Sequence, residues 1–349
     1  MHIKIPFTYS LILSFFVLSC TSSKKVYSQD LVADNMLMLQ KQSGGWPKQL
    51  DKKPVVYTKE FTIEEKAKIA VEHSTDDATI DNNATTKEIR YLLKAYQQYK
   101  IEKYLVAAEK GIQYLLDAQY KNTGGWPQFY PDKSSYRSQI TFNDNAMINA
   151  MKVLQDVSLQ QNEFALVNNK FVNPSKQAVA KGIDCILQLQ IKVNNQLTAW
   201  CTQYDAKSLK PAKARAFELA SISAAESVGI VEFLMSQPNP SPAIKEAIHA
   251  AVKWLDASKI VGYNFIEVPA PDLQTGKDKV FVQDPNSTIW ARFYDIDTNE
   301  PFVCGRNGEK KKDVKDIEHE RRIGYGWYGT WPKNLLEKKY PKWLAANPQ

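Results

Sequence analysis

The chain has 349 residues, of which 44% are hydrophobic and 24% are charged, with 14 Gly and 17 Pro. This composition is typical of a globular protein with a substantial core and excludes a disordered chain, a collagen-like chain and a small disulfide-bonded scaffold. The formal net charge of +7 suits an anionic partner without specifying its kind. Apart from Cys20, three cysteines remain, an odd number that precludes a complete disulfide framework, and no Cys-x-x-Cys motif or His cluster indicates zinc.

The N-terminus has the pattern of an export signal. Lys4 precedes an apolar run at 11–18, which is too short to span a bilayer and has the length of a signal-peptide core. The run ends in Val-Leu-Ser-Cys at 17–20, which resembles a bacterial lipobox, where cleavage leaves a lipidated Cys20 at the new N-terminus. An ordinary signal peptide is the alternative. We therefore predict a lipoprotein signal peptide over 1–19, a polar tether over 20–29 and a single domain over 30–349.

A helical unit recurs along this domain. Segments 111–119 and 182–190 echo each other, with Gly, Ile, Leu and Gln in register and apolar residues at helical spacing. Gly-Gly-Trp-Pro-Gln follows the first of them at 124–128, and Gly-Gly-Trp-Pro-Lys stands at 44–48 after an apolar stretch. A degenerate copy, Trp-Cys-Thr-Gln, lies at 200–203. Glycine ends a helix and proline prevents its continuation, so each Gly-Trp turn is predicted to terminate a helix, with Trp46 and Trp126 in the core.

A second echo follows each turn. Thr79–Ala84 parallels Thr141–Ala146, and each leads into an apolar-periodic segment, predicted as helices over 89–99 and 147–154. Thr85 and Glu88 have the spacing of a capping box at the start of the first of these helices. The third unit has Ala214–Glu218 at the corresponding place, before a predicted helix over 222–235.

Repeated helical hairpins bury their apolar faces on one another when they close into a ring. We therefore predict a mainly α fold, an α/α toroid with a small β-containing, loop-rich C-terminal cap. Equivalent loops of a toroid gather at one end, which places Asp81, Asp144 and Arg215 near a common mouth. A helical solenoid is the alternative, and its loops would not converge.

The character of the sequence changes from about Pro269. Segments 280–284 and 289–294 are predicted as short strands separated by a Pro-Asn-Ser turn at 285–287. A charged stretch and an aromatic, glycine-rich loop at 324–332 follow. Because no linker-like composition precedes this region, we interpret it as a cap on the same domain.

Carboxylates of the matched loops suggest a cation site. Asp76, Asp77 and Asp81, together with Asp144, offer the hard oxygen ligands that calcium prefers. For either loop alone, an N-terminal helix cap is the more frequent role of such an aspartate. Paired carboxylates also serve glycoside hydrolases, but a helix N-terminus favours the ionised form. We therefore interpret Asp81 and Asp144 as cation ligands rather than as general acids.

Arginines and aromatic residues suggest contacts with an anionic, ring-containing ligand. A guanidinium group grips a carboxylate bidentately, and Arg215, Arg292 and Arg306 all stand in polar or loop segments. The alternative for each is an ion pair with a structural acid such as Glu218 or Asp295. The aromatic candidates for stacking on sugar rings are Tyr204, Tyr325, Trp327 and Tyr328.

Seven motifs occur in a fixed order along the chain. They are Gly-Gly-Trp-Pro-Lys (44–48), Thr-Ile-Asp-Asn-Asn-Ala-Thr (79–85), Gly-Gly-Trp-Pro-Gln-Phe-Tyr-Pro (124–131), Thr-Phe-Asn-Asp-Asn-Ala-Met (141–147), Ala-Arg-Ala-Phe-Glu-Leu-Ala-Ser (214–221), Arg-Phe-Tyr-Asp-Ile-Asp-Thr-Asn-Glu-Pro (292–301) and Gly-Tyr-Gly-Trp-Tyr-Gly-Thr-Trp-Pro (324–332). Together they resemble the pectate lyases of polysaccharide lyase family 10 over nearly all of the chain after the tether.

This resemblance implies an α/α toroid and calcium-dependent β-elimination of polygalacturonate. The family's arginine base falls on Arg215, its calcium-site aspartates on Asp81 and Asp144, and its substrate-carboxylate arginines on Arg292 and Arg306. Asn82, which shares a motif with Asp81, is predicted to contact substrate. The third turn departs from the pattern, because Gln203-Tyr204-Asp205 stands where a His is expected in the middle, which puts the local sugar contacts in question.

The mechanism has one demanding step, because a guanidinium has a pKa above about 12. Nearby cations and desolvation must favour neutral Arg215, which predicts an alkaline rate optimum. The alternatives are a glycoside hydrolase on a related toroid and a non-catalytic, pectin-binding surface lipoprotein. The implied partners are Ca²⁺ and an acidic polysaccharide, without nucleic acid. The protein is expected to be an exported monomer of the bacterial periplasm or cell surface, an outer-membrane lipoprotein that contacts the membrane only through the lipid on Cys20.

Overall fold

The computed structural model describes Met1 and residues 30–132 and 134–348. The predicted lipobox with Cys20 and the tether lie outside the described residues. Within the part that the structure describes, no helix is both long enough and apolar enough to cross a bilayer.

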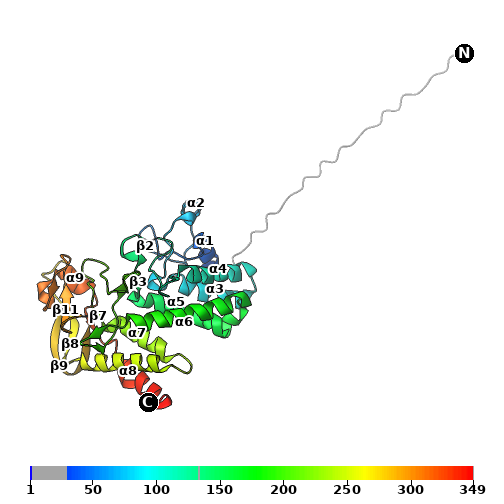
Figure 1. Cartoon of the computed structure of the whole chain (residues 1–349). Coiled ribbons are helices and arrows are strands. Elements are labelled where there is room, and N and C mark those ends of the chain that lie inside the picture. Colours follow the sequence, from blue (N-terminus) through cyan, green and yellow to red (C-terminus); the bar gives the residue numbers. More distant parts are fainter. Residues whose placement is uncertain (2–29, 133, 349) are drawn as a thin grey trace.

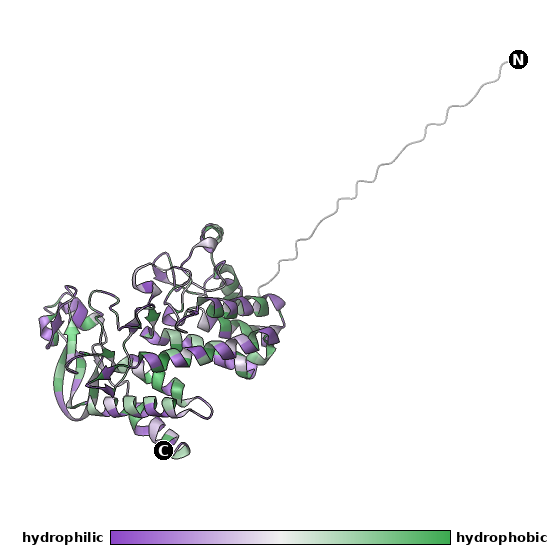
Figure 2. Cartoon of the chain, viewed as in Figure 1, coloured by the Kyte–Doolittle hydropathy of each residue, from purple (hydrophilic) through white to green (hydrophobic). Residues whose placement is uncertain are grey.

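The described chain is mainly helical, as predicted (Figure 1). Its α-helices are α1 (Leu31–Leu39), α2 (Ile63–Val71), α3 (Thr86–Tyr99), α4 (Glu102–Ala118), α5 (Ala146–Leu159), α6 (Val172–Leu189), α7 (Ala224–Met235), α8 (Pro242–Ala257), α9 (His319–Gly324) and α10 (Tyr340–Ala346). Consecutive helices pack in pairs, α3 with α4, α5 with α6 and α7 with α8. Figure 2 shows hydrophilic and hydrophobic residues mixed along these helices, as expected when one face packs on a partner and the other meets solvent.

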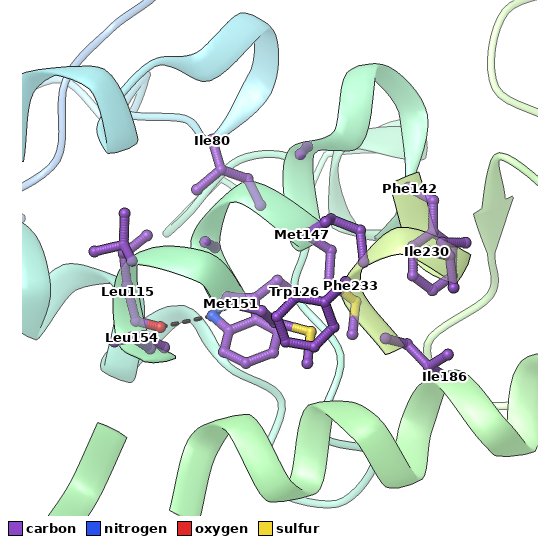
Figure 3. Packing of buried hydrophobic residues seen from close by; sticks show 14 of the residues in the cluster. Ile80, Leu115, Trp126, Phe142, Met147, Met151, Leu154, Ile186, Ile230 and Phe233 are labelled. Carbon is purple, nitrogen blue, oxygen red and sulfur yellow. Dashed lines mark hydrogen bonds between the residues drawn. The ribbon is translucent and has the colours of Figure 1, made fainter. Parts of the chain in front are cut away.

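A tryptophan plugs the end of four helices in the same way. The indole N–H groups of Trp46, Trp126 and Trp200 donate to the main-chain oxygens of Met36, Leu115 and Ile186, at 2.7, 2.7 and 2.8 Å. Figure 3 shows Trp126 donating to Leu115 among packed apolar side chains. The assignment of Trp46 and Trp126 to the core is confirmed, since both have no exposed surface.

The structure adds a fourth copy that we did not predict. Trp290 donates to the Leu255 oxygen of α8 at 2.7 Å, in the same manner as the other three tryptophans. Trp290 lies near the end of the second strand of a long pair that follows α8, 35 residues beyond Leu255, and this spacing hides the repeat in the sequence.

A glutamine and a glycine have the same structural roles in the repeated turns. Gln119 Nε2 donates to the Gly124 oxygen at 2.8 Å and to the Ala178 oxygen of the next helix pair at 2.9 Å. Gln40 and Gln190 make the corresponding bonds. Gly124 has φ +77°, and a Cβ there would lie 2.3 Å from the Lys181 oxygen, so no other residue fits without displacing α6.

The start of α3 differs from the predicted capping box. The Thr85 hydroxyl does not cap α3 but accepts from the Trp46 amide at 3.0 Å and donates to the Thr79 oxygen at 2.8 Å. Glu88 is fully buried and accepts from the Tyr57 hydroxyl at 2.8 Å. The tertiary contacts of the Trp46 turn therefore prevail over the local pattern.

The C-terminal region contains short sheets. The strands are β7 (Ile222–Ser223), β8 (Ile260–Pro269), β9 (Lys277–Ala291), β10 (Phe293–Tyr294), β11 (Pro301–Cys304), β12 (Lys310–Lys311) and β13 (Tyr328–Gly329), in the orders β12-β11-β10-β7 and β13-β9-β8. Elsewhere β1 (Gln49–Leu50) pairs with β2 (Lys53–Pro54), β3 (Ile140–Thr141) with β6 (Gln203–Tyr204) and β4 (Lys192–Val193) with β5 (Gln196–Leu197). Because β10 pairs with β7, which directly precedes α7, the C-terminal region is hydrogen-bonded to the helical region.

The predicted turn at 285–287 is wrong. β9 runs without interruption from Lys277 to Ala291, and its register against β8 shifts between Val261 and Tyr263. A bulge accommodates the missing N–H of Pro285, so proline does not end the strand.

Two apolar cores result. The larger one fills the space between the helices. The smaller one, which includes Phe217, Phe293, Phe302 and Trp327, lies under the loop that carries Arg215. Cys185, Cys201 and Cys304 are buried and form no disulfide among the described residues.

Candidate active site

Two equivalent turns carry the predicted aspartates. Asp81–Asn83 and Asn143–Asn145 are each a single 3₁₀ turn shortly before a helix, α3 and α5 respectively. Both contain a left-handed residue, Asn82 with φ 49° and Asp144 with φ 51°. Asn and Asp tolerate this region of φ and ψ better than other side chains with a Cβ. The two turns pack against each other, as the sequence echo predicted.

A pocket of about 100 Å³ lies where these turns meet the Arg215 loop. Its lining residues are Lys48, Asp81, Asn82, Gln128, Tyr136, Asn143, Asp144, Thr202, Gln203, Ala214, Arg215 and Glu218. Asp81, Asn82, Asp144 and Arg215 therefore come together in one place from three distant parts of the chain. We call this hollow the central pocket.

Asp81 forms the buried acidic side of the central pocket. It is 2% exposed, and its Oδ2 is paired with the Lys48 ammonium group. Its Oδ1 is buried and has no hydrogen-bond partner among the described residues. An unsatisfied buried carboxylate oxygen is costly, so its presence in a pocket points to a ligand.

Asp144 lies at the mouth of the central pocket and is held differently. Asn143 Nδ2 donates to its Oδ2 at 3.0 Å. Partial desolvation, followed by the charges of Asp81 and Glu226, raises the pKa of Asp144, and Arg292 opposes this. Our argument from the helix dipole predicted the opposite direction and is wrong for Asp144, because neighbouring acids outweigh the helix terminus.

The central pocket offers further oxygen atoms. Oε1 of Gln128 and Oε1 of Gln203 are buried without a hydrogen-bond partner among the described residues, like Oδ1 of Asp81. Carboxylate and amide oxygens are the ligands that Ca²⁺ prefers. The described residues contain no group of three or more His, Cys, Asp or Glu side chains that could hold a metal. The donor set therefore fits a hard cation only if amides, water or substrate oxygens complete its coordination.

Arg215 forms a bidentate ion pair with a carboxylate. Its Nε donates to Glu218 Oε2 at 2.7 Å, and its Nη2 donates to Oε1 of the same carboxylate. The Tyr325 hydroxyl also donates to Glu218 Oε1, at 2.9 Å. The hydrogen bonds from Arg215 to Glu218 raise the pKa of the guanidinium above its usual range. The expectation that the surroundings of Arg215 lower its pKa is thus wrong, because the bonds to Glu218 outweigh desolvation. The ion pair with Glu218 that we considered as the alternative is present.

Arg292 stands next to this pair. Its Nη2 is paired with buried Glu226, which also accepts from the Ser223 hydroxyl. The guanidinium carbon lies 5.2 Å from the centre of the Tyr325 ring. Nε of Arg292 is buried without a partner among the described residues. Burial acts to lower the pKa of Arg292, but the anionic groups around it, Glu226 first, hold it above the usual range.

Arg306 lies outside the central pocket but beside its Arg215 wall. It is exposed and paired with Glu320. The preceding Cys304 thiol points to the Ala216 oxygen at 3.9 Å, which places this loop against the Arg215 loop.

Some candidates are not brought to the pocket surface. Tyr204 is 1% exposed, its ring meets Phe142 edge to face, and its hydroxyl accepts from the Cys201 amide at 2.6 Å. A ring without exposed surface cannot stack on a sugar, so Tyr204 and the equally buried Trp327 leave the set of sugar-stacking candidates. Asp77 is engaged with Lys41, and neither it nor Asp76 lines the central pocket.

One positional signal finds residues that sequence reasoning missed. Lys48, Gln128 and Thr202 each stand two positions after a plugging tryptophan, and each lines the central pocket. Arg292 holds the same position after Trp290. Reading the turns as Trp-x-polar would have selected all four.

Comparison with known proteins shows which family the chain belongs to. The model of the pectic acid lyase family matches residues 40–336. The family 10 polysaccharide lyase from Cellvibrio cellulosa is 35% identical, with a TM-score of 0.77 over 89% of this chain and 91% of that one. A mutant of it in complex with trigalacturonic acid is also 35% identical, with a TM-score of 0.78 over 89% and 92%. No match was found among the curated proteins.

These matches make the protein a polysaccharide lyase. The chain belongs to the pectic acid lyase family, and the resemblance to polysaccharide lyase family 10 is confirmed.

Proposed function

We propose that the protein is a calcium-dependent pectate lyase that cleaves polygalacturonate by β-elimination. The observation that carries this proposal is the central pocket itself, where the unsatisfied Oδ1 of Asp81 and the carboxylate of Asp144 lie in one hollow with Arg215. The relative that binds trigalacturonic acid supports an acidic sugar as the ligand.

In this proposal, charged side chains make the first contacts with the substrate. The substrate carboxylate meets the partly exposed guanidinium of Arg292 and that of Arg306 at the rim. Asp81 and Asp144, with oxygens of Gln128 and Gln203, would hold Ca²⁺. When bound, this ion supplies positive charge next to the substrate carboxylate, where negative charge develops during proton removal.

Arg215 acts as the base in this proposal. It takes the C5 proton of a galacturonate unit, the C5–H electron pair forms the C4=C5 double bond, and the bond from C4 to the glycosidic oxygen breaks. The leaving oxygen takes a proton from solvent. To accept the proton, Arg215 must be neutral and must release Glu218, so the bidentate pair has to open.

Tyr325 has a supporting role. Its ring lies beneath both guanidinium groups, 5.9 Å from Arg215 and 5.2 Å from Arg292, and its hydroxyl holds Glu218. It therefore orders the arginine side of the site. Asn82, exposed beside Asp81, presents an amide to the sugar hydroxyls.

The remaining parts of the proposal concern the whole chain. The four tryptophan plugs support an α/α toroid, in which the helix pairs α3/α4, α5/α6 and α7/α8 follow one another around the central pocket. The lipobox-like sequence supports export and anchoring through Cys20. The proposal includes a monomer with the catalytic domain over 30–349.

A single assay tests the function. The mature protein is incubated with polygalacturonate and Ca²⁺, and the absorbance of the new double bond is followed with and without EDTA. Absorbance that EDTA abolishes and Ca²⁺ restores is the expected result. Reducing ends without absorbance would indicate hydrolysis instead, and EDTA-resistant absorbance would remove calcium from the proposal.

A further inference from the structure

A second hollow lies between α3 and α5 and has a volume of about 380 Å³. We call it the α3/α5 groove. It is lined by Asn83, Thr86, Lys87, Arg90, Asn149 and Lys152.

The α3/α5 groove is positively charged. Three of its six lining residues are cations, and no Asp or Glu of the described chain lines it. Lys152 has no ion-pair partner among the described residues. Arg90 is paired with Asp156 at 2.6 Å and lies 5.1 Å from the Phe164 ring centre, which fixes its direction. The one acid near Lys87 is Glu88, at 3.6 Å, and Glu88 is fully buried.

The groove adjoins the central pocket. Asn83 directly follows Asp81 and Asn82, and its Oδ1 accepts from Asn149 Nδ2 at 2.7 Å. Asn149 and Lys152 lie on α5, which begins at the Asp144 turn. Lys152 is six residues beyond Ala146, the first residue of α5, which is about 9 Å along a helix. A chain-like ligand that leaves the central pocket over Asn82 would therefore reach the groove with its next units.

We propose that the α3/α5 groove binds further uronate units of the same polygalacturonate chain that occupies the central pocket. This inference rests on the proposed function and extends it, since it assigns part of the polymer affinity to residues away from the reacting unit. Lys87, Arg90 and Lys152 pair with successive carboxylates, and the Asn83–Asn149 amides bond to hydroxyl groups.

The test is a double variant, Lys87→Gln with Lys152→Gln. Both side chains are exposed and both replacements keep helix propensity. The control is Lys94→Gln with Lys176→Gln, which removes the same charge from exposed positions of α3 and α6 outside both hollows. The measured quantity is the preference for polygalacturonate over trigalacturonate, as the ratio of kcat/KM values.

We expect this preference to fall about five- to tenfold at low salt in the groove variant, and the loss to shrink as salt increases. The control should keep the preference of the parent protein. An unchanged preference, or an equal fall in the control, would overturn the inference and leave general electrostatic steering as the cause. If the parent protein turns over neither substrate, the proposed function fails, and the same ratio measured with dissociation constants decides on the groove.

Discussion

The two sides of the central pocket differ in how many of their polar groups are paired. The aspartate side leaves oxygens unsatisfied: Oδ1 of Asp81 and Oε1 of Gln128 are buried without partners among the described residues. On the arginine side, each guanidinium is already paired, Arg215 with Glu218 and Arg292 with Glu226.

The two sides would act differently in the proposed reaction. The aspartate side has unpaired buried oxygens, which are costly, so it would be stabilised by a bound cation. The arginine side already holds its two ion pairs, and the pair of Arg215 with Glu218 would have to open before Arg215 takes a proton. The predictions that follow test each side, and one buried acid outside the pocket serves as a reference.

The largest effect is expected from Arg215→Lys, on the arginine side. Lysine keeps the positive charge but loses the planar fork, so turnover should fall about 10³-fold, the scale of a lost general base. Initial rates from product absorbance give the turnover. The dissociation constant for oligogalacturonate should stay within a few-fold of the parent value. Near-normal turnover would exclude Arg215 as the base.

The reference acid is Glu88, which also has an unpartnered carboxylate oxygen but lies in the core. Burial raises its pKa from 4.5 to about 7. The folded protein therefore keeps this proton at pH values where the unfolded chain has lost it, so stability falls as pH rises from about 4.5 to about 7. The loss amounts to about 3 kcal/mol of unfolding free energy.

Glu88→Gln cannot ionise and should remove this pH dependence. Urea unfolding at pH 5 and pH 8 measures it in both proteins. An equal pH dependence in the variant would assign the effect to other groups.

On the aspartate side, Asp144→Asn keeps the shape and removes one charge. The Ca²⁺ concentration for half-maximal activity should rise at least about tenfold, because ligand charge sets calcium affinity. Rates over a calcium titration measure it. Asp117→Asn, on the exposed face of α4, is the matched control and should change nothing. An unaltered calcium requirement would place the cation elsewhere.

The smallest effect is expected from Glu218→Gln, which tests the ion pair of Arg215. Glu218→Gln removes the anion whose hydrogen bonds raise the pKa of Arg215. Neutral Arg215 then forms at lower pH. The rising limb of the pH–rate profile, which follows deprotonation of the base, should therefore shift to lower pH by about one unit. Tyr325→Phe removes only one bond to Glu218 and should move the limb less. A limb that stays in place would show that Glu218 has left Arg215 before proton transfer.

The sequence predicted the parts of the fold that local chemistry encodes. Gly124 must be glycine because its φ is positive and a side chain would meet α6, and Trp126 must be large because it plugs the end of α4. Both requirements recur at fixed spacing, so the repeat and the meeting of Asp81, Asp144 and Arg215 could be predicted.

Pairing between distant segments could not be predicted in the same way. Tyr204 is buried because β6 pairs with β3 and turns the ring onto Phe142. The partners of the arginines depend on which acids the fold brings near, and Glu226 comes from α7, 66 residues before Arg292. The Trp290 copy could not be predicted because Trp290 lies near the end of β9, 35 residues beyond Leu255.

The tryptophan turns separate anchoring from recognition. In each turn an indole is fixed in the core, and the side chain two positions later reaches the pocket rim at Lys48, Gln128 and Thr202. The main chain at two of these positions is held by hydrogen bonds from neighbouring loops, from Thr79 and Ile80 to the Gln128 oxygen and from Phe142 to the Thr202 oxygen. A substitution at Lys48, Gln128 or Thr202 can therefore change which acidic polysaccharide is preferred without altering the packing of the helices.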